Sequence, residues 1–291
     1  MDILLYGLAF IIMFSIGISL KTDDFLKILQ NPRNLLIGLI TQIVLPPLLV
    51  ILIIFNFPIE PQIKIGFLIL SVSPGGHVSN YLNYFFNCNV PLCLSITVIN
   101  TFIIPISIPL ILNYFLKTVL PTNPNLEISF SKFIIEIIFI SSIPILAGII
   151  LSKLMPRIRK TEKILKPITS ILFSLVLAIS LLRNASGGSR FFVSETVITI
   201  AIALSLNIFL MIIGYSLIKT NLRDARTIGV EIGIHNTPMA LIIVNVLNVP
   251  TAALPIIFYA LFTLWTAILF LFITGKYNKG VMKNPVDAAT K

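Results

Sequence analysis

The residue with the most informative chemistry in this sequence is Glu231, a carboxylate inside a long apolar run. After Asp224, Glu231 is the only carboxylate in that run. A carboxylate in such surroundings is costly and indicates a functional site by default, the alternatives being a protonated group or one paired within the core. The break beside Glu231 is crowded by neutral polar residues and histidine, without Lys or Arg, so its natural partner is a cation from outside the chain. Na⁺ suits this place because it takes oxygen ligands from carboxylate, hydroxyl, amide and carbonyl groups.

The two histidines of the chain, His77 and His235, each lie at a break in an apolar run. A histidine in such a place contacts a substrate, carries a proton or binds a cation, unless it is a core histidine satisfied by a backbone carbonyl. Glu231 and His235 are four residues apart, hence on one face if a helix continued between them. With His77 they would form a zinc-like ligand set, but no HExxH-type motif supplies the usual context.

Both breaks consist of residues that interrupt a helix. In the first, Pro74 removes a backbone hydrogen bond, and Gly75 and Gly76 lower the cost of leaving the helix. In the second, Thr237-Pro238 is a helix-start signal inside an apolar run. Irregular backbone is not tolerated in contact with lipid, so both breaks are expected to face protein or a water-filled cavity.

The composition indicates which solvent surrounds these residues. Of the 291 residues, 57% are hydrophobic and 11% are charged, and the mean hydropathy is +1.02. A soluble domain carries about 25% charged residues, so this balance excludes an ordinary soluble enzyme, a disordered tail and a nucleic-acid binder. We predict an all-α polytopic membrane protein, a single transmembrane unit over 1–291 with nine transmembrane helices. The expected spans are 3–20, 35–56, 63–87, 91–115, 130–153, 167–186, 192–218, 225–248 and 251–274.

The breaks fall in the third and the eighth expected span, five spans apart. Because five is odd, a unit repeated at that offset is inserted upside down. Interrupted segments at corresponding positions of two halves are typical of the binding site of a secondary transporter. The short joints that follow the breaks, Asn89-Val90-Pro91 and Asn248-Val249-Pro250, support such a repeat weakly.

The distribution of positive charge predicts the orientation. With the N-terminus placed outside, most of the 21 Lys and Arg residues fall in loops on the inner side, as the positive-inside rule requires. The run 3–20 is expected to be a membrane helix and not a signal peptide, because it lacks a cationic start and a small-residue cleavage site. We therefore expect a protein of the cell (inner) membrane with its C-terminus in the cytoplasm. Binding of anionic lipid is an alternative role for the basic loop 153–166.

The two interrupted segments resemble those of the bile acid:sodium symporter family. The run 73–80 (SPGGHVSN), followed by Asn89-Val90 and Thr97, resembles the first crossover of the family. The run 231–236 (EIGIHN) resembles the second crossover, where the family carries a Glu-x-Gly-x-Gln-Asn pattern. The flanking run 38–42 with Pro46 and the first span fit as well, so the resemblance covers nearly the whole chain.

The resemblance implies a nine-helix member, an inverted repeat whose first helix is missing, with two broken crossing helices. It also implies alternating access by motion of a core domain against a panel domain. The panel would hold the spans 3–20, 130–153 and 167–186. The core would hold the spans 35–56, 63–87, 91–115, 192–218, 225–248 and 251–274.

Two Na⁺ sites are implied by the same resemblance. The first comprises Ser79, Asn80, Cys93, Thr97 and Glu231. The second comprises Gln42, Glu231, the carbonyls of Ile232 and Ile234, and His235. Cys93 stands where the family has a serine, and a thiol is a poor ligand for a hard cation. His235 stands where the family has glutamine; a neutral imidazole offers one lone pair, whereas a protonated one repels Na⁺. One or two bound Na⁺ ions are therefore expected.

The substrate is implied to lie beside the crossovers, near Gly76, His77, Asn236 and Thr263. Two half-helix N-termini point there, and their partial positive charge suits an anion. We predict symport of a small organic anion, a bile-acid-like or pantoate-like carboxylate, with Na⁺ alone or with Na⁺ and H⁺, and no covalent chemistry.

Other functions fit parts of the same pattern. A proton-coupled organic anion carrier or a cation/proton antiporter on a related scaffold is the main alternative. An intramembrane metal-dependent hydrolase and a non-transporting receptor are further ones, because a fold does not fix a function. The sequence leaves the oligomeric state open.

Overall fold

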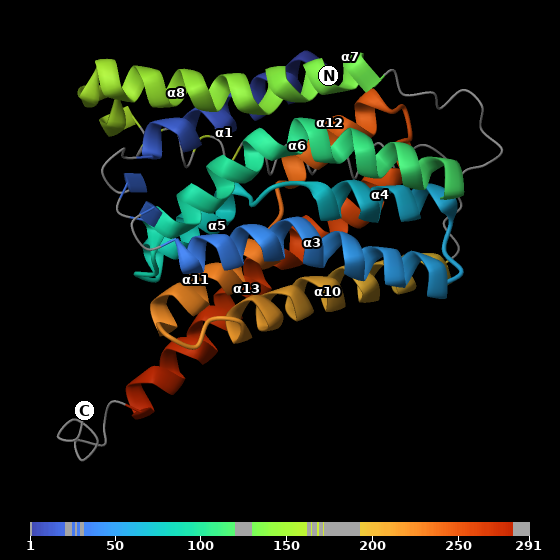
Figure 1. The fold of residues 1–291 in the computed structure, drawn as a ribbon. Helices are drawn as coiled ribbons and strands as arrows, with labels where there is room; N and C mark the ends of the chain where they lie inside the picture. The colour runs from blue at the N-terminus through green and yellow to red at the C-terminus, as the bar shows by residue number, and fades with distance from the viewer. Residues whose placement is uncertain are drawn as a thin grey trace.

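The fold is helical throughout the part of the chain that the structure describes. The computed structural model describes residues 2–20, 25–26, 28–29, 32–119, 130–161, 164, 168, 171 and 193–281, and no β-strand occurs among them. Figure 1 shows the elements lying side by side with their axes roughly aligned. In chain order they are α1 (Asp2–Ser19), α3 (Arg33–Asn56), α4 (Pro61–Val72), α5 (His77–Phe85), α6 (Val90–Val119), α7 (Phe130–Ile137), the π-helical turn η1 (Ile138–Ser142), α8 (Ile143–Leu154), the 3₁₀ turn η2 (Pro156–Thr161), α10 (Val193–Ser216), α11 (Leu222–Gly233), α12 (Thr237–Val246), the 3₁₀ turn η3 (Pro250–Ala252) and α13 (Ala253–Val281).

Five described segments are long and apolar enough to cross a membrane. They are Arg33–Asn56, Val90–Phe115, Ile134–Leu154, Glu195–Ser216 and Pro250–Gly275, and the shorter apolar helices are Ala9–Ser19, Pro61–Val72 and Thr237–Val246. Large apolar side chains also cover the outside, where Trp265 is 70% exposed. Such a surface belongs in lipid, so the chain is a multi-pass membrane protein. The expected span 167–186 lies outside the described residues except at 168 and 171, and the count of nine helices stays a prediction.

Two helices are interrupted, within the expected spans 63–87 and 225–248. Helix α4 ends because Ser73 is extended and Pro74 has no N–H to continue the ladder; α5 then begins after Gly76. Helix α11 ends at Gly233 because Ile234 is extended, and α12 begins with Asn236 as its N-cap. The sequence signals for leaving and restarting a helix therefore act at both positions.

The joints after the two breaks differ in where their turns fall. Both turn back at once, and each uses an asparagine with a φ of 53°, in the left-handed region. These residues are Asn87 and Asn248, so only the second belongs to an Asn-Val-Pro motif. Asn89 instead donates its backbone N–H to the Thr227 hydroxyl at 2.8 Å. The matching motifs are therefore not equivalent positions, because the first joint is two residues longer between the turn and its proline.

One layer of helices lies on one side of the others. Helices α1, α7 and α8 are at the top of Figure 1, above α4, α6 and α12. A Cβ atom on Gly17 would collide with the carbonyl oxygen of Ile145, and one on Gly148 with that of Phe14. Glycine at these two positions lets the backbones of α1 and α8 approach closely, a common way to pack helices in membranes.

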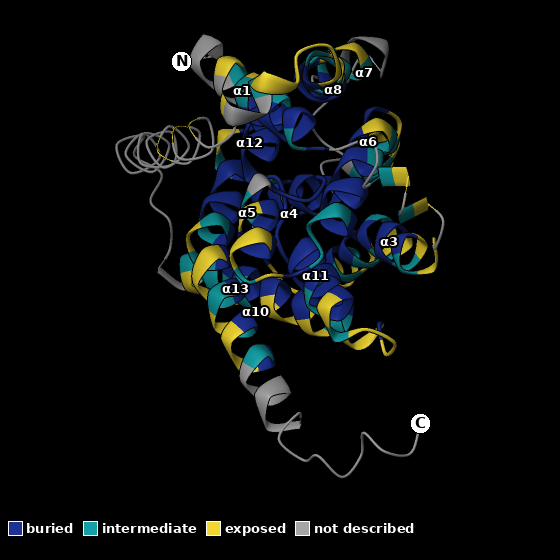
Figure 2. Cartoon of the chain, turned by 90° about the vertical axis from the view of Figure 1, so that its left-hand side faces the viewer, coloured by how far each residue is buried: buried dark blue, intermediate teal, exposed yellow. Residues whose placement is uncertain are grey.

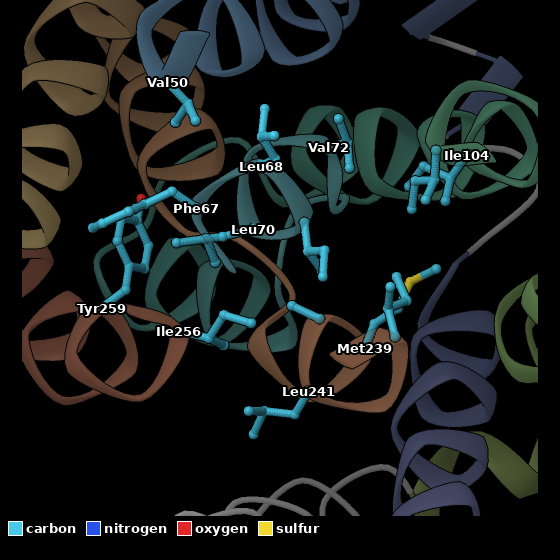
Figure 3. Close-up of a cluster of buried hydrophobic side chains, with 14 of the residues drawn as sticks. Val50, Phe67, Leu68, Leu70, Val72, Ile104, Met239, Leu241, Ile256 and Tyr259 are labelled. Atoms are coloured by element: carbon cyan, nitrogen blue, oxygen red, sulfur yellow. The ribbon is translucent and has the colours of Figure 1, made fainter. Parts of the chain in front are cut away.

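The middle of the molecule is filled by α4, which is buried on all sides from Ile65 to Val72. Figure 2 shows the buried residues concentrated there, and the exposed ones on the outer helices. In Figure 3, Phe67 of α4 lies beside Tyr259 of α13, and Val50 of α3 and Met239 of α12 belong to the same cluster of buried side chains. A helix that is apolar all round belongs at the centre of a bundle, so the breaks that follow α4 and α11 are placed at the centre too.

Candidate ion and substrate site

The two breaks meet at the centre of the bundle and pair with each other. Gly75 and His235 form an antiparallel bridge, the only two-residue pairing of this type among the described residues. The Gly76 N–H donates to the Ile234 carbonyl at 2.9 Å, and the Asn236 N–H donates to the Pro74 carbonyl at 2.8 Å. Each unwound segment thus satisfies backbone groups of the other, which is required away from water.

Glu231 sits in the last turn of α11 with no exposed surface. One carboxylate oxygen accepts hydrogen bonds from the Ser79 hydroxyl and, at 2.9 Å, from the Cys93 thiol. The other accepts one from the Thr97 hydroxyl. A Cβ atom on Gly75 would collide with this second oxygen, so glycine at the first break makes room for the carboxylate of the second. Three neutral donors from α5 and α6 therefore surround one buried carboxylate.

Two asparagines of α5 complete this cluster around the Cys93 sulfur. The sulfur lies 3.1 Å from the Asn80 Oδ1 atom and 3.1 Å from the Asn83 Nδ2 atom. The Asn83 amide nitrogen also donates to the Ser79 carbonyl at 2.9 Å, so its orientation is fixed. Asn83 Oδ1 and Asn80 Nδ2 are then buried without a hydrogen-bond partner. Unpaired buried polar atoms beside a carboxylate are typical of a place where a ligand binds.

The structure thus brings together all five residues expected for the first ion site. Hydroxyl groups that now donate to the carboxylate of Glu231 can turn their lone pairs to a cation, whereas the Cys93 sulfur is a soft ligand. Asn83 was missed in the sequence. The signal was its spacing, because it follows Ser79 by one helical turn and so lies on the same face.

The second expected ligand set gathers at His235 and Gln42. The His235 Nδ1 atom lies 3.1 Å from the Ser73 carbonyl oxygen and 3.4 Å from the Gln42 Nε2 atom. One ring nitrogen cannot both donate to the carbonyl and accept from the amide, and the shorter contact favours the tautomer with the proton on Nδ1. The His235 Nε2 atom then carries a lone pair. It and Gln42 Oε1 are both buried without a partner, and both fit a cation ligand.

Ile232 and Ile234 flank this point on the backbone. Ile232 lies in the last turn of α11 with no exposed surface, and Ile234 is the extended residue that follows the helix. The Ile234 carbonyl already accepts from Gly76, which leaves it a second lone pair. The structure therefore places these residues beside His235, and their role as ligands stays a prediction.

The residues expected at the substrate divide into two groups. Gly76 and Asn236 are the N-caps of α5 and α12, so two helix N-termini meet at the crossing. The Asn236 Oδ1 atom caps the Met239 N–H at 3.1 Å, and its Nδ2 atom lies 3.8 Å from the Met13 sulfur of α1. His77 begins α5, but its side chain lies outside what the structure describes.

Thr263 belongs to a different polar cluster. Its hydroxyl accepts from the Asn207 Nδ2 atom at 2.6 Å, and that amide also donates to the Gly233 carbonyl. Asn207 was missed in the sequence, although an asparagine in the middle of the apolar span 192–218 was a signal. The contact of Thr263 with a substrate stays a prediction.

A third polar cluster lies at the start of α11. The Asp224 carboxylate accepts from the Asn34 amide at 2.7 Å and from the Asn89 amide at 2.8 Å. These bonds tie α3, α11 and the turn before α6 to one another. Burial raises the pKa of the nearby Cys88 thiol, and the charges of Arg226 and Arg223 oppose that effect. The raised pKa favours the neutral form of the Cys88 thiol.

Comparison with known proteins identifies the family of this chain. The sequence model of the Sodium Bile acid symporter family matches residues 6–187, which include the first crossing segment. The chain is 25% identical over 278 residues to the uncharacterized sodium-dependent transporter YocS of Bacillus subtilis (strain 168), covering 94% of this chain and 82% of that protein. It is 24% identical to the human hepatic sodium/bile acid cotransporter, covering 99% of this chain and 83% of that protein.

A further relative is longer than this chain. The mouse P3 protein is 27% identical over 82% of this chain, and the match spans half of the P3 protein. The matching family and the Bacillus subtilis and human relatives are transporters, not enzymes. The chain belongs to the sodium bile acid symporter family.

Proposed function

We propose that this protein is a secondary transporter that couples the entry of Na⁺ to that of a small organic anion. The observation that carries the proposal is Glu231. It is a fully buried carboxylate held by two hydroxyls and a thiol where two unwound helices cross. Neutral donors stabilise its charge, and a cation among them would balance that charge. Sodium dependence in the names of the bacterial and human relatives supports Na⁺ as that cation.

Charge balance sets the expected stoichiometry. One carboxylate from Glu231 and one from the substrate require two positive charges to cross without a large desolvation cost. Two Na⁺ ions would supply them, one among Ser79, Asn80, Cys93 and Thr97 and one between Gln42 and His235. One Na⁺ with one proton on a histidine is the other solution.

The architecture that we propose is the nine-helix inverted repeat, with the N-terminus outside and the C-terminus in the cytoplasm. In Figure 1, α3 runs opposite to α10, α4 opposite to α11 and α6 opposite to α13, as inverted halves require. The panel domain would comprise α1, α7 and α8 with the span 167–186, and the remaining helices would form the core. Movement of the core against the panel would expose the crossing to each side of the membrane in turn.

The substrate would bind between the crossing and α1. On one side are the helix N-termini that begin at His77 and Thr237, and the Asn236 amide nitrogen, which contacts the Met13 sulfur. On the other side is the apolar face of α1, where Met13 and Ile12 are buried. An anionic group would meet the N-termini and an apolar body would meet α1. A bile-acid-like or a pantoate-like carboxylate fits this description.

A proton-coupled carrier or a cation/proton antiporter is the second candidate, and one observation favours it. The His235 ring is an ionisable group at the crossing, where the second cation is expected. A proton-coupled carrier would respond to pH and would not distinguish Na⁺ from K⁺, whereas an antiporter would need no organic substrate.

The test is thermal stability of detergent-purified protein in Na⁺ against K⁺ at equal ionic strength, followed by uptake in proteoliposomes. A ligand that binds only the folded state adds about 2.7 kcal/mol to the free energy of unfolding at a concentration of a hundred times its Kd. This added stability raises the melting temperature. We expect the wild type to be stabilised by Na⁺, and Glu231→Gln to lose that response.

Matched variants on α6 sharpen the result. Thr97→Val removes a hydroxyl that contacts Glu231 and should weaken the response. Thr101→Val removes a hydroxyl that bonds only the Thr97 carbonyl in its own helix, so it should keep the response. Full Na⁺ stabilisation of Glu231→Gln would contradict the assignment. A melting temperature of the wild type that is equal in Na⁺ and K⁺ but changes with pH would favour the proton-coupled carrier.

A further inference from the structure

The carbonyl group of Gly233 is held by two donors from two other helices. Gly233 is the last residue of α11, where the helix unwinds and its final carbonyls lose their helical partners. The Asn207 Nδ2 atom of α10 donates to this carbonyl at 2.6 Å, and the Tyr259 hydroxyl of α13 donates at 2.8 Å. Both lone pairs of the oxygen are therefore occupied.

The amide of Asn207 is itself fixed. The Thr266 hydroxyl donates to its oxygen, and its second amide hydrogen points to the Thr263 hydroxyl at 2.6 Å. Asn207 and Tyr259 have no exposed surface. Because every polar atom of the Asn207 side chain has a partner, this cluster holds the backbone and offers no free ligand of its own.

The corresponding amide on the other side of the crossing differs. Gln42 of α3 contacts His235, but its oxygen is buried without a partner. One side of the crossing thus presents a free amide oxygen, as an ion ligand needs, and the other presents an amide with no free atom. The Gln42 amide can therefore act as a ligand, whereas the Asn207 amide supports the backbone.

Close packing makes the support rigid. A Cβ atom on Gly233 would collide with the side chain of Met211 on α10. Gly229, one turn earlier, would meet the Met211 carbonyl oxygen at 2.9 Å in the same way. The end of α11 therefore lies directly against α10, and its backbone cannot shift toward that helix.

Fixing the Gly233 carbonyl also fixes the direction of its neighbours. The peptide group that joins Gly233 to Ile234 is planar, so holding the oxygen holds the Ile234 N–H as well. Ile234 is extended, and its own carbonyl accepts a hydrogen bond from the Gly76 N–H at 2.9 Å. With the Gly233 carbonyl turned to α10 and α13, the extended Ile234 turns its carbonyl to the opposite side, which is the crossing.

We propose that Asn207 and Tyr259 are positioning residues for the second ion site, and that they hold the unwound end of α11 so that the backbone at Ile232 and Ile234 faces the cation. This inference rests on the proposed Na⁺ coupling. Neither residue touches the ion or the substrate, and both act through the Gly233 carbonyl.

The test uses Tyr259→Phe, which removes one donor and keeps the ring that packs 5.7 Å from the ring of His235. Asn207→Ala removes the other donor. Two readouts are taken on the full chain in detergent: the half-saturating Na⁺ concentration for thermal stabilisation, and hydrogen exchange of the segment 231–237 without Na⁺. We expect Tyr259→Phe to raise the half-saturating concentration about twofold to tenfold, the usual range for one hydrogen bond, and to speed local exchange.

Matched controls come from the same two helices. Thr199→Val on α10 and Thr274→Val on α13 each remove a buried hydroxyl that bonds only within its own helix. They should lower the melting temperature without changing the Na⁺ response or the exchange of 231–237. If Tyr259→Phe behaves like these controls, its role is merely structural and the inference is wrong.

The exchange readout separates this inference from the proposed function. A wild type with no Na⁺ response would refute the coupling but not the positioning. In that case faster exchange of 231–237 in Tyr259→Phe and Asn207→Ala would support their hold on the crossing. Unchanged exchange in both variants would overturn it.

Discussion

Cys93 is the residue at which the cluster around Glu231 departs from oxygen chemistry. Its sulfur lies within 2.9 Å of the carboxylate and 3.1 Å of Asn80 Oδ1, so it occupies the place of a ligand. A hydroxyl is a harder ligand for Na⁺ than a thiol. We predict that Cys93→Ser lowers the half-saturating Na⁺ concentration about twofold to tenfold, which corresponds to about 0.5–1.5 kcal/mol.

The measurement is the Na⁺ titration of the melting temperature, with Cys88→Ser as control. Cys88 is also buried and free, but it lies in the joint before α6, away from the donors to Glu231. An unchanged or weaker Na⁺ response in Cys93→Ser would show that the sulfur takes no part in ion binding.

Which functional residues could be predicted depends on how local their signal is. Glu231 stands out because a single carboxylate in an apolar run is costly wherever the helix packs. Asn207 and Tyr259 act on Gly233 from positions 26 residues away in each direction. Their role depends on how α10, α11 and α13 pack, which no periodicity in one helix reveals.

At the scale of the helices, too, local features could be predicted from the sequence and contacts between distant segments could not. Pro74, Gly75 and the Thr237-Pro238 pair determine where helices break, so the interruptions of 63–87 and 225–248 were visible in the sequence. The pairing of Gly75 with His235 was not, since it joins backbones of two distant segments. The joints show the limit of matching motifs, because the first left-handed turn falls on Asn87, two residues before its Asn-Val-Pro motif, whereas the second falls on Asn248 within its motif.

Contact between α1 and α8 can be tested with a single methyl group. Gly148→Ala would place its Cβ against the Phe14 carbonyl oxygen and 2.9 Å from the Ile18 nitrogen. Because backbone cannot move aside cheaply, we predict a loss of about 1–3 kcal/mol, seen as a lower melting temperature. The Na⁺ response should persist, because Gly148 lies in α8 and the donors to Glu231 lie in α5 and α6.

Gly7→Ala on α1 is the matched control. Apart from its chain neighbours and the nearby backbone of its own helix, no atom lies within 4 Å of the Cβ position at Gly7. Alanine is favoured over glycine inside a helix by about 0.5–1 kcal/mol, so this variant should be as stable as the wild type or more so. Equal stability of Gly148→Ala and Gly7→Ala would mean that α1 and α8 do not pack closely in the membrane protein.

Across the whole molecule, two helices of opposite direction, α3 and α10, bring two acidic residues together at one end. Glu60 lies between α3 and α4, and Glu195 lies in the first turn of α10. Helix α3 runs toward this end and α10 begins at it, as Figure 1 shows. Burial raises the pKa of the Glu60 carboxyl group, and the negative charge of Glu195 raises it further.

The sign of the resulting pH effect follows from that direction. A raised pKa means that the fold prefers the protonated group, so the stability from Glu60 is present below its unfolded pKa and is lost as the pH rises through the folded pKa. We predict that Glu60→Gln has no effect on the melting temperature at about pH 3.5 and raises it at about pH 7.5. In a Glu195→Gln background the gain should be smaller, because one source of repulsion is gone. A gain in melting temperature of equal size at both pH values would mean that the charge of Glu60 is not its cause. An equal gain in the wild-type and Glu195→Gln backgrounds would mean that the fold does not bring these two carboxylates together.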